Sequence, residues 1–394
     1  MNLISVKDVD LKDKRVLVRV DFNVPLKDNV VTDDTRIKRA LPTIEYILGQ
    51  KGTRIIVMSH LGRPKGKKDP TFSMAPVAKR LSELLNKPVT LATDVVGEEV
   101  EQQVASLQEG EILLLENTRF YKEEEANDPS FSKQLAALGD IYINDAFGAA
   151  HRAHASTEGV THYLESAAGL LVEKEIAFFA PLLENPKKPF VAIIGGAKVS
   201  SKITVLESLA KRCDAIVIGG AMAYTFLYVQ GHNIGKSMVE KEYIDTANSF
   251  LQEAKELDVR IILPVDHVGA LEFSETSTPV AVDTVDIPDN LIGLDIGPKT
   301  EALIANELKD AQSIVWNGPM GVFEFASFSH GTQEVAKMVA SSKGITVVGG
   351  GDSVAAVNQF GYDKDIDHVS TGGGASLEFL EGRQLPGITP LERK

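Results

Sequence analysis

The stretch RVLVRVDFN, residues 15–23, places an apolar, β-branched run directly before two polar side chains, Asp21 and Asn23. A run this apolar is typical of a strand in a parallel sheet that helices cover on both faces. In open parallel sheets, ligands bind beyond the carboxyl ends of the strands. The stretch therefore predicts an α/β fold and draws attention to the residues that follow its strand.

Similar apolar runs recur along the chain, at 54–58, 112–115, 140–143, 190–194, 215–218, 260–263, 313–316 and 345–348. The segments 73–85, 169–183, 200–211, 237–256 and 332–340 carry apolar residues at the spacing of helices. Strands alternating with helices predict mainly parallel sheets. A break at 183–189 marks the entry to a second half, and the helix at 169–183 is expected to connect the two halves.

Composition excludes several classes of protein. The 394 residues carry a net charge of −14, whereas proteins that bind nucleic acids are normally basic. No apolar run reaches the ~20 residues that span a bilayer, and the N-terminal residues lack a signal-peptide pattern. The single cysteine, Cys213, rules out an intramolecular disulfide and a Cys-based zinc site, and we interpret it as a buried bystander. A cytoplasmic protein without nucleic-acid or membrane partners is expected.

Basic residues nevertheless concentrate locally, between Arg36 and Lys68, where Glu45 is the acidic residue. A basic island on an acidic protein is a candidate anion site, although a solvated surface would explain it equally well. By contrast, Glu123 to Glu125 reads as a short acidic loop with no assigned function.

Glycine groups end the strands of the second half. They are Gly195-Gly196-Ala197-Lys198, Gly219-Gly220-Ala221, Gly349-Gly350-Gly351-Asp352-Ser353 and Gly372-Gly373-Gly374-Ala375-Ser376. Glycine lets backbone amides approach a phosphate closely, and a helix that begins there adds a favourable dipole. Tight turns need glycine as well, but four such groups favour nucleotide or phosphate binding. Asp352 and Ser353 are expected in the N-cap region of a helix.

The common nucleotide and hydrolase motifs are missing. The segment 231–237, GHNIGKS, is one residue too short for a P-loop, and we interpret it as a loop with a helix cap at Ser237. The chain contains no G-x-G-x-x-G, which disfavours a dinucleotide-dependent oxidoreductase. Protein-kinase, zincin and serine-hydrolase motifs are absent as well.

In the first half, polar segments follow the strands at 59–64, 116–120 and 144–154. Arginines there and at position 36 could converge with His60 on a phosphate and a carboxylate, because the planar guanidinium binds both groups with two hydrogen bonds. Taken singly, an arginine is more often part of a surface ion pair.

These segments together resemble the phosphoglycerate kinases. The resemblance rests on RVLVRVDFNVP (15–25), SHLGRPKG (59–66), ENTRFY (116–121), NDAFGAAHRAHAST (144–157), GGAKVSSKI (195–203), LDIGPKT (294–300), WNGPMGVFE (316–324), GGGDS (349–353) and STGGGASLEFLEG (370–382). It covers essentially the whole chain in order. Ala221 departs from the family pattern, which usually has a third glycine there, near the adenine pocket.

The resemblance implies two Rossmann-like lobes, each a mainly parallel sheet flanked by helices, joined by a hinge helix. Residues 1–170, with a returning tail at 379–394, would bind 3-phosphoglycerate. Residues 171–185 would form the helix between the lobes, and residues 186–378 would bind the nucleotide and include a hinge segment at 371–374. The family is usually monomeric.

The resemblance also implies site residues. The acid substrate would be bound by Asp21, Asn23, Arg36, Ser59, His60, Leu61, Gly62, Arg63, Arg119 and Arg152. The nucleotide would be bound by Gly196, Ala197, Lys198, Lys202, Gly220, Gly293, Asn317, Pro319, Val322, Glu324, Gly350, Gly351, Asp352 and Ser353. Catalysis would rest on Arg36, Lys198, Lys202, Gly350 and Gly351, and Asp352 would engage the Mg2+ that accompanies ATP or ADP.

The expected reaction moves a phosphoryl group between 1,3-bisphosphoglycerate and ADP. In the reverse direction the nucleophile is a carboxylate, which with a pKa near ~3.5 is already ionised at pH 7 and needs no general base. Positioning and charge neutralisation then suffice, without a covalent enzyme intermediate. The alternative is a non-catalytic nucleotide-binding protein on the same fold.

Overall fold

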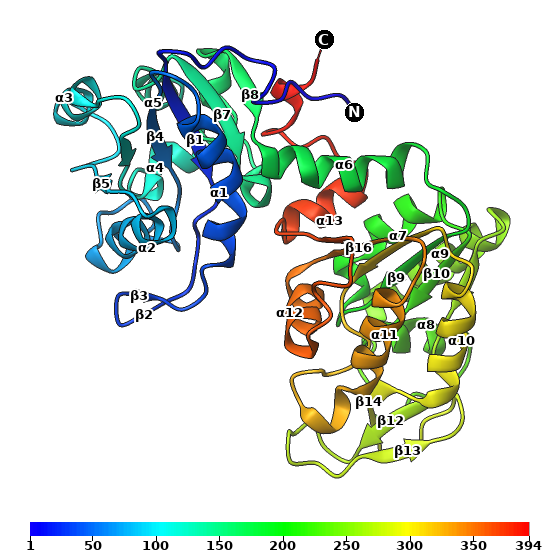
Figure 1. The fold of residues 1–394 in the computed structure, drawn as a ribbon. Helices are drawn as coiled ribbons and strands as arrows, with labels where there is room; N and C mark the ends of the chain where they lie inside the picture. The colour runs from blue at the N-terminus through cyan, green and yellow to red at the C-terminus, as the bar shows by residue number, and fades with distance from the viewer. Residues whose placement is uncertain (394) are drawn as a thin grey trace. The chain divides into compact units, whose positions relative to one another are not determined.

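The computed structural model describes residues 1–393, which form two compact units. The first unit comprises Met1–Ala177 and the described residues from Gln384 onward, and the second comprises Phe178–Arg383. The helix α6 (Leu170–Glu184) runs from the first unit into the second, close to the bounds predicted from the sequence (Figure 1).

The first unit is built on a six-stranded sheet with the order β5-β6-β4-β1-β7-β8, in which every neighbouring pair is parallel. Its strands are β1 (Arg15–Val20), β4 (Arg54–Met58), β5 (Val89–Leu91), β6 (Ile112–Leu114), β7 (Ile141–Asp145) and β8 (Ser166–Ala168). A short hairpin of β2 (Leu26–Lys27) and β3 (Val30–Val31) precedes the first helix.

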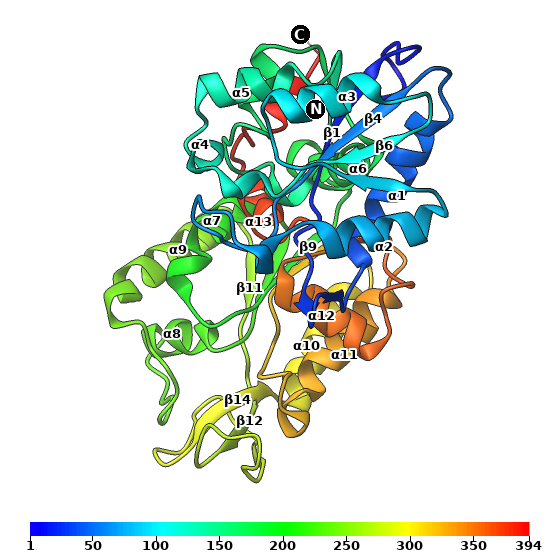
Figure 2. The same ribbon diagram turned by 90° about the vertical axis from the view of Figure 1, so that its left-hand side faces the viewer.

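Alternating side chains of β1 supply two separate cores. Val16 and Val18 pack with α1 (Thr35–Leu48) and α2 (Ala75–Leu85), whereas Leu17 packs with α3 (Glu98–Ser106) and α5 (Pro129–Ala136). Figure 2 shows these two pairs of helices on opposite sides of the sheet. The apolar run quoted above is thus buried on both faces, as a covered parallel sheet requires.

The second unit repeats this plan with the strand order β11-β10-β9-β15-β16-β17, again parallel throughout. The strands are β9 (Phe190–Ile194), β10 (Ala215–Ile218), β11 (Arg260–Ile262), β15 (Ser313–Asn317), β16 (Ile345–Gly349) and β17 (His368–Val369). The order reverses between β9 and β15, so their carboxyl ends form a switch point where such sheets bind ligands.

Helices cover both faces of this sheet as well. On one side, α10 (Pro298–Leu308), α11 (His330–Ala340) and α12 (Gly351–Phe360) bury apolar residues against it. On the other side lie α7 (Ile203–Ala210), α8 (Met222–Val229), α9 (Ile244–Glu256) and α13 (Gly374–Leu380) (Figure 2). A smaller antiparallel sheet of β12 (His267–Ala270), β13 (Val280–Val282) and β14 (Ile292–Ile296) was not predicted.

The α/β fold with parallel sheets and the burial of Cys213 are confirmed, but two helix starts were placed wrongly. The helix predicted from Ser237 begins at Ile244, and the Ser237 hydroxyl instead accepts the amide of Gly293 at 2.9 Å. Asp352 and Ser353 lie inside the first turn of α12, whose N-cap is Gly350. Gly350 has φ of 90°, a backbone conformation that favours glycine over a capping side chain.

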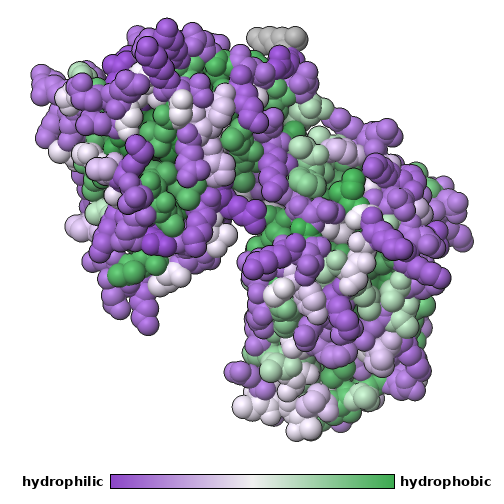
Figure 3. Space-filling model, in the orientation of Figure 1, coloured by the Kyte–Doolittle hydropathy of each residue, from purple (hydrophilic) through white to green (hydrophobic). Residues whose placement is uncertain are grey.

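The surface of each unit is largely hydrophilic in the view of Figure 3. Over residues 1–393, no helix combines the length and the apolar character needed to cross a membrane.

One carboxyl group lies buried at the end of the first sheet. Asp145 closes β7, is fully buried, and accepts the backbone amide of Leu171 at 2.9 Å near the start of α6. Burial raises the pKa of Asp145 to about 7, despite hydrogen bonds from Thr43 and from the helix that lower it. This carboxyl is therefore protonated in the folded protein at pH values where it ionises in the unfolded chain.

The Asp145→Asn variant is expected to change how stability depends on pH. Between about pH 4 and pH 7 the unfolded wild type releases this proton and the folded form keeps it, so this group lowers wild-type stability by up to ~1.4 kcal/mol per pH unit. Asparagine does not titrate. In urea denaturation, the stability of the variant relative to the wild type should rise across this window and stay constant above it; a difference independent of pH would contradict the assignment.

Candidate active site

In the first unit, the strand ends place charged side chains in contact. Asp21 follows β1, and its carboxylate pairs with Arg36 of α1 at 2.6 Å, from Nη1 to Oδ2. The Asp21 side chain is 11% exposed, whereas that of Arg36 is 37% exposed, so the guanidinium remains open to solvent. Burial would raise the pKa of Asp21, but the carboxylate faces Arg36, Arg19 and the backbone amide of Asn23, and its pKa is lowered.

His60 follows β4 and is 6% exposed. Arg19, which is 1% exposed, places Nη2 3.1 Å from His60 Nδ1. Burial lowers the pKa of His60 well below its usual value, and the nearby Arg19, Arg119 and Arg36 lower it further, against the opposing effect of Asp21. His60 is therefore neutral at pH 7, and the positive charge here comes from arginine.

Hydrogen bonds hold the surrounding loops in place. Asn23 Oδ1 accepts the amide of Gly62 at 2.8 Å, and the Ser59 hydroxyl accepts the amide of Phe22 at 2.8 Å. Arg119 donates through Nη1 to the carbonyl of Gly62 at 3.0 Å. The loops after β1, β4 and β6 are thereby fixed against one another, and the predicted residues on them share one neighbourhood.

The remaining residues predicted for the acid lie around this neighbourhood. Leu61 is buried beneath it, and its amide is accepted by Asn117, a fully buried residue that was not predicted. Arg63 is exposed on the loop after β4. Arg152 is also exposed, and its charge acts on both Arg119 and His154.

The prediction of an acidic loop at Glu123 to Glu125 was wrong. These residues form the short helix α4 (Lys122–Glu125), and Glu124 is fully buried. Glu124 accepts the hydroxyl and the amide of Ser156, and Ser156 Oγ in turn accepts Arg19 Nε at 2.7 Å. The sequence signal that could have indicated these buried polar contacts was Arg19, a charged residue at an inward-facing position of an apolar strand.

In the second unit, the switch point opens into a cavity of about 340 Å3. Its lining comprises Gly195, Gly196, Ala197, Lys198, Ser201, Lys202, Asn317, Gly318, Gly350, Gly351, Asp352 and Ser353. Three strand ends contribute, those of β9, β15 and β16, together with the first turn of α12. Of these lining residues, Gly195, Ser201 and Gly318 were not among those predicted.

Lys202 is held inside this cavity. Its Nζ donates to Asn317 Oδ1 at 2.5 Å. Burial lowers the pKa of Lys202, while Asp352 and Glu381 oppose that shift. Lys198 is exposed on the same lining. The two ammonium groups and the free amides at the start of α12 make the cavity suitable for phosphate groups.

Glycines are required here because backbones touch. A Cβ on Gly318, whose φ is 97°, would lie 2.1 Å from the carbonyl oxygen of Gly195. A Cβ on Gly220 would lie 2.4 Å from the carbonyl oxygen of Gly196. The strand ends are thus packed main chain to main chain, which leaves their amides close to any bound group.

Other residues predicted for the nucleotide do not line the cavity. Gly293 lies beside Tyr224, whose hydroxyl would be 2.2 Å from an added Cβ. The amide of Val322 donates to the carbonyl of Leu294 at 2.9 Å, and Glu324 is exposed two residues later. Pro319 lies against Gly195.

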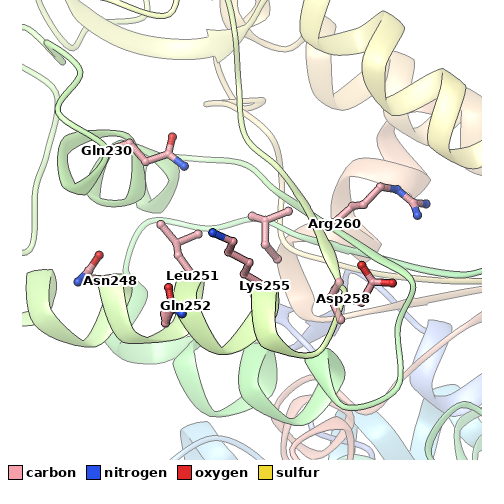
Figure 4. A pocket seen from close by; sticks show the side chains of 9 residues that line it. Gln230, Asn248, Leu251, Gln252, Lys255, Asp258 and Arg260 are labelled. Carbon is pink, nitrogen blue, oxygen red and sulfur yellow. The ribbon is translucent and has the colours of Figure 1, made fainter.

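A second hollow, of about 410 Å3, lies on the surface of this unit between α9 and β11. Figure 4 shows Leu251, Gln252 and Lys255 on the helix and Arg260 beyond them. It contains none of the predicted residues. Its Arg260 already pairs with Glu307 at 2.8 Å, so this hollow presents no comparable set of free cationic groups and amides.

Known proteins of one family are similar to this chain over its length. The family model for phosphoglycerate kinase matches residues 6–383. The phosphoglycerate kinase of Borrelia turicatae (strain 91E135) is 60% identical over 393 residues, covering 100% of both chains. That of Clostridium novyi (strain NT) is 53% identical over 397 residues, again with complete coverage.

Solved structures give the same result. The chain superimposes on phosphoglycerate kinase from Coxiella burnetii with a TM-score of 0.90 and 44% identity, covering 99% of this chain and 98% of the other. The enzyme from Pyrococcus horikoshii OT3 gives a TM-score of 0.86 at 33% identity, with the same coverage.

The Gly318→Ala variant is expected to destabilise the second unit by about 2 kcal/mol or more, because alanine at this φ is strained and its methyl group meets the Gly195 carbonyl. Gly351→Ala is a matched control, since a Cβ there has nothing within 4 Å. Urea denaturation of both variants tests this. Equal stabilities would show that the strand ends are not closely packed.

Proposed function

The chain belongs to the phosphoglycerate kinase family, and we propose that its first unit binds the three-carbon acid while its second binds the nucleotide. The reaction is the reversible transfer of a phosphoryl group from 1,3-bisphosphoglycerate to ADP, which gives ATP and 3-phosphoglycerate in glycolysis. The enzyme is a phosphotransferase with a carboxyl group as acceptor.

The ion pair of Arg36 with Asp21 at the strand ends of the first unit, with His60 nearby, carries the proposal for the acid. Asp21 orients Arg36 at 2.6 Å, and the exposed guanidinium can take the substrate carboxylate with two hydrogen bonds. Arg63, Arg119 and Arg152 belong to the same proposed site and would neutralise the phosphate at the far end of the substrate.

The nucleotide site is proposed at the cavity beside α12. The amides of Gly350 and Gly351 would bind phosphate oxygens at the helix start, and Lys198 and Lys202 would neutralise the group in transfer. Because Lys202 donates to Asn317, it is fixed before the nucleotide arrives. The full set proposed above from Gly196 to Ser353 stays a prediction, including Gly220, Gly293, Val322 and Glu324.

No general base is needed in this mechanism. The acid substrate attacks as a carboxylate that is ionised at pH 7, so the protein has only to align the reacting atoms and offset their charge. Arg36 holds the attacking carboxylate, and the amides of α12 and the two lysines hold the phosphoryl oxygens. Exclusion of water would protect the acyl phosphate from hydrolysis.

Asp352 fits a Mg2+ ion that arrives with the nucleotide. It is the carboxylate among the residues that line the cavity, and it is exposed there. Mg2+ is usually bound by one or two carboxylates together with substrate phosphates. Within residues 1–393 no cluster of three or more His, Cys, Asp or Glu side chains could hold a metal by itself. The ion would supply charge neutralisation on the nucleotide phosphates.

Direct transfer requires the two bound substrates to meet, so we propose that the chain closes by hinge bending in each catalytic cycle. The helix α6 and the segment 371–374 are the hinge candidates. We also propose that the enzyme works as a cytoplasmic monomer, as its family resemblance suggests; gel filtration and cell fractionation test these two points.

The test of the proposed function mixes the protein with ATP, Mg2+ and 3-phosphoglycerate and traps acyl phosphate with hydroxylamine. Product should require both substrates, and Lys202→Ala should reduce it strongly because the transferring phosphoryl loses a fixed charge. ADP binding without product in the wild type would instead support a non-catalytic nucleotide-binding protein.

Replacing Arg36 with alanine is expected to lower kcat on the order of a thousandfold, since the acid loses its bidentate partner in the transition state. The dissociation constant for ADP, measured by calorimetry, should stay within about twofold because the nucleotide site lies on the other unit. Comparable losses of turnover and ADP affinity would contradict the role given to Arg36. Lys38→Ala, two residues along α1, serves as control.

A further inference from the structure

A buried series of hydrogen bonds, called the relay below, leads to His60 in the first unit. It connects Glu124, Ser156, Arg19 and His60 in that order. Glu124 and Ser156 are fully buried, Arg19 is 1% exposed and His60 is 6% exposed. Of these four residues, only His60 belongs to the predicted site, so the other three need a separate explanation.

The contact between Arg19 and His60 determines which ring nitrogen carries the proton. A guanidinium can only donate, so His60 Nδ1, 3.1 Å from Arg19 Nη2, must accept. The ring is then neutral at Nδ1, and its proton is on Nε2. Doubly protonated imidazole would place two donors against each other at this distance.

Arg19 can impose this choice because it cannot turn. Its Nε donates to Ser156 Oγ at 2.7 Å, and its Nη1 donates to the carbonyl of Val20. The Ser156 hydroxyl donates a hydrogen bond to one carboxylate oxygen of Glu124, and the other oxygen accepts the Ser156 amide at 2.9 Å. Each donor of this serine is therefore satisfied by Glu124, which leaves the hydroxyl oxygen to accept from Arg19.

The charges of Arg19 and Glu124 within this series of hydrogen bonds also balance. Arg19 is a buried cation, and Glu124, linked to it through one hydroxyl, is a buried anion. An unpaired buried charge would be strongly destabilising. Glu124 thus offsets the positive charge of Arg19 beneath the proposed anion site.

We propose that Glu124 and Ser156 are positioning residues which, through Arg19, fix His60 as the neutral tautomer with its proton on Nε2, a hydrogen-bond donor for the anionic substrate. The second half of this statement rests on the proposed function of the site, whereas the tautomer itself does not. A neutral donor adds a directed hydrogen bond among the arginines without adding another positive charge.

The tautomer is measured on the full chain without ligand. Long-range 1H–15N correlation spectra near pH 7 distinguish the two neutral forms of histidine and the imidazolium, and the His60 signals are assigned by their loss in His60→Gln. The wild type should show the Nε2–H form alone. An Nδ1–H or imidazolium spectrum in the wild type would overturn the proposal whatever the variants do.

Ser156→Ala tests the relay. It should give exchange between the two neutral tautomers of His60 and roughly a tenfold rise in the KM for 3-phosphoglycerate, the effect of about one hydrogen bond, with the KM for ATP unchanged. Tyr142→Phe is the matched control, because the Tyr142 hydroxyl donates to the Ser156 carbonyl at 2.8 Å and is equally buried, but lies outside the relay.

A pure Nε2–H spectrum in folded Ser156→Ala would refute the positioning role of Ser156. A mixture of the two neutral tautomers in Tyr142→Phe would refute it as well. If Ser156→Ala does not fold, Glu124→Gln replaces it, since the amide cannot accept both hydrogens of Ser156. A wild type that shows the expected tautomer but no turnover would refute the proposed function and leave the tautomer assignment intact.

Discussion

The parallel pairing of strands is the constraint on which both candidate sites depend. β1 pairs in register with β4 and β7, and β9 pairs in register with β10 and β15, so the carboxyl ends of each set meet at one edge. A slip of one residue would turn every alternate side chain to the other face. Burial of both faces of the strands prevents that slip. The fixed register in turn determines where the residues that follow the strands lie.

The two proposed sites would meet the same demand, the binding of anions, in different ways. The first uses side chains, with Arg36 oriented by Asp21 and Arg19 balanced by buried Glu124. The second uses the main chain, where Gly195 and Gly318 touch and Gly350 caps α12. Close glycine contacts fix main-chain amides in place without burying a charge. A buried arginine, by contrast, needs an anion and hydrogen-bond acceptors around it.

Much of this was accessible from the sequence because the signals are local. The strand at 15–20 was predicted with its bounds, and the glycine groups after β9 and β16 line the cavity of the second unit. That this cavity binds phosphate stays a prediction. Contacts between distant segments were not accessible. Glu124 reads as part of an acidic loop until it is known that Ser156, 32 residues away, turns back onto it. The short antiparallel sheet and the role of Ser237 likewise depend on tertiary pairing.

In the proposed mechanism a carboxylate attacks the phosphoryl group directly, with charge neutralisation and no enzyme nucleophile. The stereochemistry at phosphorus tests this most directly. ATP made chiral at its γ-phosphorus with oxygen isotopes is converted with 3-phosphoglycerate, and the configuration of the transferred group is determined. We expect inversion, the result of a single in-line displacement. Retention would require two displacements through a phosphorylated side chain and would contradict it.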